Sequence, residues 1–323
     1  MAVSNQRHDP GIGTQYTINS KRIINRDGSF NVIRSGLRWS TRDTYQLMIK
    51  MSWSRFLLVV FTFLLAINGV FALLYSVMSD NQFGGIKPTH FYEKFLDAYY
   101  FSFQTFTTVG YGVLHPTGHW ANIVASFEAV VGWMCFAIIT GMLYGRFSKP
   151  SARLMYSDKA LITPYSNGLN SIQFRIANMR KSNLMEMEAT ALLVVVEKQK
   201  DGKGILRRRF IELQLERQSI LFFPLNWTLV HVIDEKSPFG NKTKEEMKAM
   251  DAEILVMIKG FDDTFSQTVH SRYSYKCDEI VWGAKFTPVY ETQLSGEIVL
   301  DFDKMHDYVE VELNETPQHE PVN

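Results

Sequence analysis

Two long apolar runs dominate the first half of the chain. Phe56 to Tyr75 is twenty residues without a charged side chain, and Ala121 to Tyr144 is a second run interrupted only by Glu128. A helix of about 20 predominantly apolar residues is long enough to cross the hydrocarbon of a bilayer. The pattern therefore predicts two membrane-spanning helices, at about 56–77 and 120–145.

The segment between these runs is expected to enter the membrane without crossing it. Residues 79–94 are a short polar loop, and residues 95–106 are rich in aromatic side chains but too few to span. We expect 95–106 to be a re-entrant pore helix, followed by an irregular segment at 107–112. Such backbone is tolerated at membrane depth only where protein buries it or where it lines a water-filled path. Residues 55–148 are therefore predicted to be a pore domain.

An amphipathic slide helix is expected before the first span, over residues 41–54. Its apolar side chains alternate with polar ones, as in a helix that lies in the membrane interface. The preceding residues 1–40 are polar, and we expect a flexible segment with a turn at 25–28. Lysine and arginine are concentrated before the first span and after the second, which places both termini in the cytoplasm. The apolar residues of the helix are Tyr45, Leu47, Met48, Met51 and Trp53.

The second half of the chain has the pattern of short β-strands separated by turns. Such a pattern predicts an all-β sandwich, which we place at 149–313, with a single helix at 243–250. Residues 314–323 are expected to be a disordered tail. The clearest strands are 172–176, which alternates, 191–196, which is continuously apolar, and 253–258, which is apolar after Glu253.

Composition narrows the class of protein. The 323 residues carry a net charge of +1, which provides no field for binding nucleic acid. Aromatic residues reach 13 %, as suits a pore domain, while a mean hydropathy of −0.09 requires most of the chain to be soluble. Cys135 and Cys277 lie far apart, so neither a disulfide framework nor a metal cluster is expected. The scattered histidines, without a triad or paired acids, predict neither an enzyme nor a resident cofactor.

The six residues after the pore helix have the chemistry of a potassium filter. A dehydrated K⁺ needs a cage of oxygens, and Gly110 and Gly112 permit backbone angles that let successive carbonyls face one axis. One chain supplies a quarter of such a cage, so the segment implies a homotetramer. The alternative, a turn in an ordinary strand, is disfavoured by the position between two spans. The expected filter residues are Thr107, Thr108, Val109, Gly110, Tyr111 and Gly112, with K⁺ ions held at Thr108, Val109, Gly110 and Tyr111.

The sequence TVGYG resembles the potassium-channel filter, and further motifs accompany it in order. From about Asn25 to Phe302 the chain resembles the inward-rectifier potassium channels, their prokaryotic branch most closely. The resemblance implies a multi-pass homotetramer of the plasma (inner) membrane, whose immunoglobulin-like cytoplasmic sandwich continues the ion path. The motifs are Asn25-Arg26-Asp27-Gly28, Arg146-Phe147-Ser148-Lys149-Pro150, Ala177-Asn178-Met179-Arg180-Lys181, His231-Val232-Ile233-Asp234-Glu235-Lys236-Ser237-Pro238 and Cys277-Asp278-Glu279-Ile280-Val281-Trp282-Gly283.

The resemblance also assigns a gate and a cytoplasmic vestibule. Tyr144 matches the narrowing of the inner helices, although a tyrosine of the interfacial belt is the alternative. Strongly rectifying relatives carry an acid at the position of Phe136, and Lys259 replaces a second acid, whereas Glu186 matches a vestibule acid. The resemblance thus implies weak rectification, with Ba²⁺, Mg²⁺ or polyamines as blockers. The full gate and cavity set is Phe136, Gly141, Tyr144 and Phe147.

Filter support and lipid binding complete the expected sites. Glu128 is expected to face the back of the filter and to hydrogen-bond there beside Gln104. Eukaryotic relatives have an ion pair where this chain has Gln104 and Leu114. Juxtamembrane basic residues attract anionic lipid headgroups. Arg146, Lys149 and Arg153 also fix the orientation of the chain in the membrane, which is the alternative explanation for them. The matching positions are Arg146, Lys149, Arg153, Arg180 and Lys181, with Trp53 and Arg55 joining them from the slide helix.

The function expected from these features is a K⁺-selective channel gated at the inner-helix crossing by the cytoplasmic domain and anionic lipid. One alternative is a two-span channel with a nucleotide- or Ca²⁺-binding domain, but the second half has no glycine-rich phosphate fingerprint. Another is a membrane-anchored binding or scaffold protein with a vestigial pore, against which the intact filter argues.

Overall fold

The computed structural model of the chain divides into two compact units, residues 35–149 and residues 1–34 with 150–323. The described residues are 6–7, 9–16, 22–33, 35–36, 41–85, 90–149, 152–180, 182–198, 206–240 and 242–314.

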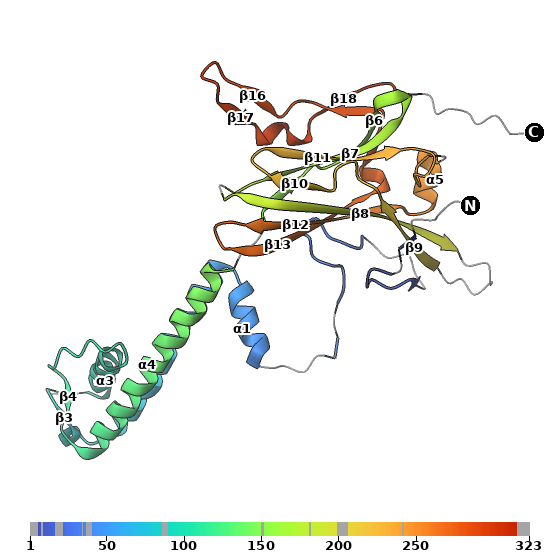
Figure 1. Ribbon diagram of the computed structural model, residues 1–323. Helices are drawn as coiled ribbons and strands as arrows, with labels where there is room; N and C mark the ends of the chain where they lie inside the picture. The colour runs from blue at the N-terminus through green and yellow to red at the C-terminus, as the bar shows by residue number, and fades with distance from the viewer. Residues whose placement is uncertain are drawn as a thin grey trace, which may run out of the picture. The chain divides into compact units, whose positions relative to one another are not determined.

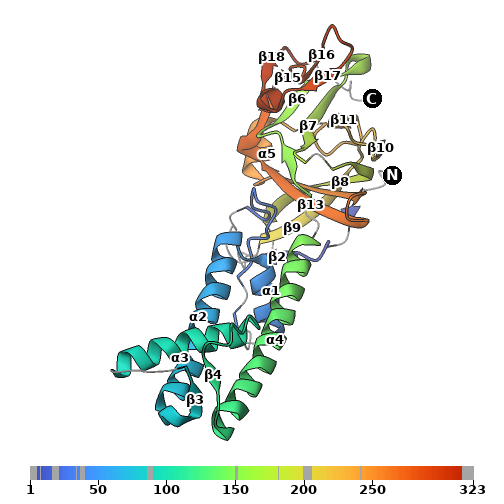
Figure 2. The same ribbon diagram turned by 90° about the vertical axis from the view of Figure 1, so that its left-hand side faces the viewer.

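The first unit holds the two candidate membrane spans (Figure 2). Two of its helices, α2 and α4, are long and apolar enough to cross a bilayer. The elements, in order, are α1 (Thr41–Lys50), α2 (Trp53–Val77), η1 (Asp80–Gln82), β3 (Phe83–Gly84), α3 (Phe91–Phe106), β4 (His115–Pro116) and α4 (His119–Phe147).

Two helix boundaries in this unit differ from the sequence prediction. The slide helix α1 ends at Lys50, because Ser52 is extended (φ −60°, ψ 153°) and begins α2 as its N-cap. Trp53 and Arg55 therefore belong to the first turn of the first span and not to the slide helix. The pore helix α3 begins at Phe91, four residues earlier than predicted, with Glu93 in its first turn. An acid there is favourable beside the positive end of the helix dipole.

An aromatic cluster fixes the pore helix against the first span. Tyr75 of α2, Phe83 of β3 and Phe101 of α3 meet edge to face, with ring centroids 5.1–5.5 Å apart. Such pairs contribute about 0.5–1.5 kcal/mol each beyond the area they bury. Small residues on α4, Ala121 and Ala125, complete the cluster from the other side.

The second unit is a β-sandwich of two sheets (Figure 1). The larger sheet has the order β1-β9-β8-β12-β13, with β2 on β9 and β10 on β8. The smaller has the order β11-β7-β6-β14, with β5 on β7. The strands of the larger sheet are β1 (Gln6–Arg7), β2 (Gln15–Tyr16), β8 (Leu184–Lys198), β9 (Leu206–Leu213), β10 (Ser219–Phe222), β12 (Glu253–Asp262) and β13 (Gln267–Lys276). Those of the smaller are β5 (Leu154–Tyr156), β6 (Ala160–Pro164), β7 (Asn170–Asn178), β11 (Asn226–Ile233) and β14 (Ile280–Trp282).

Alternation along the strands builds the core between the sheets. Ile172, Phe174 and Ile176 of β7 face Ile254 and other apolar side chains of the larger sheet. The predicted single helix is α5 (Lys244–Ala249), which Thr243 and Glu246 begin with a reciprocal capping box. The remaining elements are η2 (Ser166–Gly168), η3 (Cys277–Glu279), β15 (Ala284–Phe286), β16 (Tyr290–Thr292), β17 (Ile298–Leu300), η4 (Phe302–His306) and β18 (Tyr308–Glu310). The predicted fold class, two spans with a pore helix plus an all-β sandwich, is confirmed.

The expectation of a flexible N-terminal segment is wrong for its described residues. Residues 6–7 and 15–16 pair with β9, and the predicted turn at 25–28 forms. Ile23 and Ile24 are buried against Leu192, Leu255 and their neighbours on the larger sheet. The apolar pair was overlooked because its partners lie far along the chain.

The predicted C-terminal tail, 314–323, starts one residue too early, because Asn314 is bound to the sandwich. Asn314 exchanges hydrogen bonds with Asn170, at 2.9 and 3.0 Å, and its amide donates to the carbonyl of Leu169. The rest of the predicted tail lies outside the described residues.

Candidate functional site

The backbone after the pore helix alternates in handedness. Thr108, Gly110 and Gly112 have φ of 59°, 54° and 80°, while Val109 and Tyr111 between them do not take positive φ. A positive φ at every second residue turns successive carbonyls towards one side of the chain, whereas an ordinary strand alternates them. The positive φ of Thr108 was not foreseen, because only the other two positions, 110 and 112, carry glycine, the residue that favours positive φ. A non-glycine residue in this region is held at a cost of about 1–3 kcal/mol.

Hydrogen bonds join this segment to the last turn of α3. The carbonyl of Gln104 accepts from the amides of Val109 (2.9 Å) and Gly110 (3.3 Å), and the Thr107 hydroxyl donates to the Phe103 carbonyl (2.6 Å). Gln104 thus supports the filter through its backbone carbonyl. Helix α4 lies close to the end of α3 at Gly132, because a Cβ on Gly132 would collide with the carbonyl oxygen of Phe106.

The single chain leaves the filter segment open. Val109 and Tyr111 are 52 % and 75 % exposed, although both are large apolar side chains. Surfaces of this kind usually mark a contact with another molecule.

A buried polar cluster joins the three membrane helices behind the pore helix. Glu128 of α4 accepts from the Tyr75 hydroxyl of α2 (2.5 Å) and is hydrogen-bonded through Oε1 to the Ser102 hydroxyl of α3. Ser102 also lies 3.0 Å from Oδ1 of Asn68 on α2. The predicted partner of Glu128 was the filter, but its hydrogen bonds go to the pore helix and the first span. Tyr75 and Ser102 were overlooked, and the signal for them was that a buried carboxyl needs donors.

Arg146, predicted to meet lipid, is already occupied within the first unit. Its guanidinium donates to the carbonyls of Met48, Ile49 (3.3 Å) and Met51 (2.7 Å), at the end of α1. The same group lies 4.6 and 4.5 Å from the rings of Trp53 and Phe56. Arg146 therefore caps the slide helix from the end of α4, in a sandwich of two aromatic rings.

The other predicted gate and lipid residues are mostly exposed. Tyr144 and Phe136 are 73 % and 70 % exposed, and Phe147 lies 4.9 Å from Trp53, ring to ring. Nothing lies within 4 Å of a Cβ placed on Gly141. Arg55, Lys149 and Arg153 are exposed, Arg180 is half-buried, and Lys181 lies outside the described residues.

The predicted vestibule residues lie on neighbouring strands of the larger sheet. Lys259 of β12 forms an ion pair with Glu188 of β8 (3.0 Å), and not with Glu186. Glu186 is exposed, with a φ of 49°, close to an irregularity in the pairing of β8 with β12. The lysine thus neutralises an acid that the sequence analysis had not considered.

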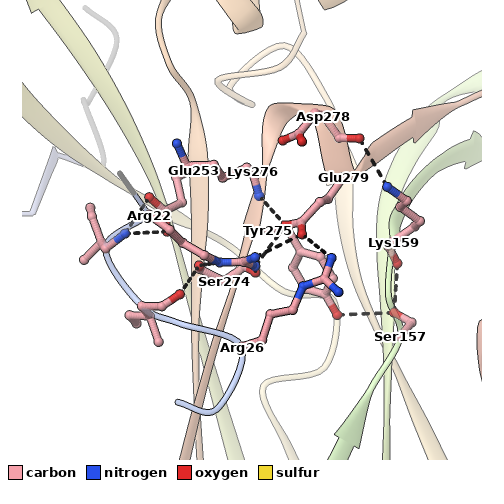
Figure 3. Close-up of polar contacts among 12 residues, drawn as sticks. Arg22, Arg26, Ser157, Lys159, Glu253, Ser274, Tyr275, Lys276, Asp278 and Glu279 are labelled. Atoms are coloured by element: carbon pink, nitrogen blue, oxygen red, sulfur yellow. Dashed lines mark hydrogen bonds and ion pairs between the residues drawn. The ribbon is translucent and has the colours of Figure 1, made fainter. Parts of the chain in front are cut away.

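Residues 22–33, here called the N-terminal strap, are bound to the sandwich by two buried acids (Figure 3). Both oxygens of Glu279 accept from Arg22, at 3.0 and 2.9 Å, and Arg26 adds a third bond at 2.9 Å. The Glu253 carboxylate accepts from the amide of Ile23, 3.1 Å from each oxygen. This network fixes the segment that precedes the slide helix in the chain.

The pKa values of the two acids that bind the strap are shifted in opposite directions. Burial raises the pKa of Glu253 above its usual range, and its hydrogen bonds from Ser274 and Ile23 only partly oppose this. Burial alone would also raise the pKa of Glu279. The Lys276 amide and the two arginines outweigh it and hold that pKa below its usual range.

Comparison with known proteins identifies both units. Residues 154–322 match the family model of the inward rectifier potassium channel C-terminal domain, and residues 57–149 match that of an ion channel. The chain is 36 % identical over 288 residues to the inward rectifier potassium channel Kirbac3.1 of Paramagnetospirillum magnetotacticum, covering 88 % of this chain and 95 % of that one. It is 27 % identical over 309 residues to the G protein-activated inward rectifier potassium channel 4 of Mus musculus, covering 90 % and 73 %.

Proposed function

Because the chain belongs to the inward-rectifier potassium channel family, we propose that it conducts K⁺ through the carbonyls of residues 107–112. The observation that carries the proposal is the alternation of φ at Thr108, Gly110 and Gly112, which turns successive carbonyls to one side. Ions would be held by Thr108, Val109, Gly110 and Tyr111, whose oxygens replace the hydration shell of K⁺. K⁺ is here the transported ion and not a resident cofactor.

Four copies of the chain would surround one axis. The exposed Val109 and Tyr111 side chains support this, since they would be buried against neighbouring subunits. One copy would line only a quarter of the path, so conduction requires the tetramer. We place the homotetramer in the plasma membrane with both termini in the cytoplasm, following the positive-inside rule.

Gating would occur where the inner helices α4 cross. Tyr144 is exposed near the end of α4, and four such side chains facing one axis would close a path by steric block and dewetting. Arg146, held by the end of α1, would transmit movement of the slide helix to the gate. Anionic lipid would act through Arg55, Lys149, Arg153, Arg180 and Lys181.

Rectification would be weak. The cavity position that attracts internal cations in strong rectifiers is Phe136 here, and the Lys259 ammonium neutralises Glu188 in the vestibule. Glu186 would be the acid left to attract cations or their blockers, Ba²⁺, Mg²⁺ and polyamines.

The test is ⁸⁶Rb⁺ uptake into liposomes that hold the purified protein under an outward K⁺ gradient, repeated with Na⁺ inside. We expect uptake that needs K⁺, stops with Ba²⁺ and is abolished by Gly110→Ala. Gly69→Ala is the matched control, because a Cβ there meets no atom within 4 Å. Uptake by the Gly110→Ala tetramer with intact selectivity would refute the filter. Absence of uptake by wild type and Tyr144→Ala in every lipid would favour a scaffold with a vestigial pore.

A further inference from the structure

The buried cluster behind the pore helix is enclosed by protein on all sides. Asn68, Ser102 and Glu128 are fully buried and Tyr75 is 1 % exposed. Among the described residues, no lysine, arginine or histidine forms an ion pair with Glu128. Its contacts are the two hydroxyl groups of Ser102 and Tyr75. A carboxylate with a full charge would therefore have no cation to compensate it in this site.

The orientation of Asn68 is fixed independently of the acid. Its Nδ2 donates to the carbonyl of Leu64 at 2.7 Å, so Oδ1 is the atom that faces Ser102, at 3.0 Å. Exchanging the two amide atoms would place two oxygens against each other at Leu64. The Ser102 hydroxyl is thus surrounded by acceptors, namely Oδ1 and the carbonyl of Asn68 and Oε1 of Glu128.

A count of protons shows that the cluster is one donor short. A serine hydroxyl carries a single proton, which can reach Asn68 Oδ1 or Glu128 Oε1 but not both. If Glu128 is ionised, one of these oxygens is buried without a donor, or two oxygens meet with no proton between them. A proton on Oε1 removes the conflict, since Glu128 then donates to Ser102, Ser102 donates to Asn68, and Tyr75 donates to Oε2.

We propose that Glu128 is a neutral carboxylic acid in the folded channel and positions the pore helix by donating its proton to Ser102. This deepens the proposed function and rests on it, because the pore helix matters to conduction only if it carries the filter. The arrangement holds α2, α3 and α4 together without placing a negative charge behind the filter. Glu128 is on this view a positioning residue, acting through Ser102 and the last turns of α3.

The direct test is infrared spectroscopy of the purified channel, wild type against Glu128→Gln, at neutral pH. We expect the difference spectrum to contain the C=O stretch of a protonated carboxyl group and to lack the paired bands of a carboxylate. Carboxylate bands in its place would overturn the proposal. This readout needs no ion flux, so an inactive channel would refute the proposed function while leaving the protonation of Glu128 decided.

A second arm asks whether a neutral donor is enough for conduction. The glutamine amide donates to Ser102 and its carbonyl accepts from Tyr75, so we expect Glu128→Gln to rescue the ⁸⁶Rb⁺ uptake that Glu128→Ala loses. Ser102→Ala leaves buried groups unpaired and should lower uptake about tenfold. Ser126→Ala is the control on α4, because that hydroxyl is exposed and bonds only to the Asn122 carbonyl. Uptake that Glu128→Gln loses as completely as Glu128→Ala, from an intact tetramer, would show that the charge is needed.

Discussion

The inner helix α4 approaches the end of the pore helix closely at Gly132, and Gly132→Ala tests this contact. A Cβ at Gly132 would overlap the Phe106 carbonyl oxygen and lie 3.0 and 3.1 Å from the Phe106 carbonyl carbon and Cα. These are backbone atoms at the end of α3, so no side chain can rotate away, and α4 must move back from the helix that carries the filter. Overpacking of this kind costs about 1–3 kcal/mol.

The control is Gly69→Ala in the interior of α2, where the added Cβ meets nothing within 4 Å. Both substitutions gain up to about 1 kcal/mol of helix propensity. The gain therefore cancels between them, and we expect Gly132→Ala to be less stable than Gly69→Ala by roughly 1–3 kcal/mol. The assay is the thermal midpoint of the detergent-solubilised protein by circular dichroism, with ⁸⁶Rb⁺ selectivity on the same preparations. Equal midpoints and equal selectivity would refute the close approach.

Four further substitutions test the N-terminal strap, the end of α1 and the cavity. Glu279→Gln should loosen the N-terminal strap and speed deuterium exchange of residues 22–33, because Arg22 and Arg26 lose their shared carboxylate. Since the pKa of Glu279 is lowered, its contribution is present above the usual glutamate range and is lost as the pH falls through the lowered value. Glu253→Gln should cost less, because the pKa of Glu253 is raised and ionising it opposes folding; equal exchange in both variants would contradict this. Arg146→Lys should speed exchange at the end of α1, because a single ammonium nitrogen cannot occupy the positions of both guanidinium nitrogens, Nη1 at Met48 and Ile49 and Nη2 at Met51. Unchanged exchange would show that Arg146 does not cap this helix. Phe136→Asp should strengthen polyamine block in liposome recordings by at least about tenfold if its side chain faces the cavity, and unaltered block would place it elsewhere.

The features that the sequence predicted well are those that a local pattern decides. Twenty apolar residues make a span wherever they occur, and Gly110 and Gly112 mark left-handed backbone by themselves. Alternation in β7 and the short helix predicted at 243–250 are equally local. The end of the slide helix was misplaced, because the break at Ser52 is a backbone choice that the apolar pattern, continuing to Trp53, conceals.

The features that the sequence missed depend on partners far apart in the chain. Arg22 and Glu279 are 257 positions apart, and neither residue is unusual in its own surroundings. Ser102 is one polar residue in an aromatic helix, and its importance appears only when Asn68 and Glu128 converge on it. Arg146 is a juxtamembrane basic residue of the kind that binds lipid headgroups, but in the structure its guanidinium donates to carbonyl groups at the end of α1.

The alternation of backbone handedness in the filter has a consequence for which amino acids can build it. No atom lies within 4 Å of a Cβ placed on Gly110 or Gly112, so space alone would admit alanine at both positions in the single chain. What disfavours alanine is its chirality, because an L-residue resists the positive φ that a D-residue prefers. A protein made by chemical ligation with D-alanine at Gly110 should therefore keep the backbone that L-alanine destroys. Glycine suits these positions because it is the one genetically encoded amino acid that is achiral.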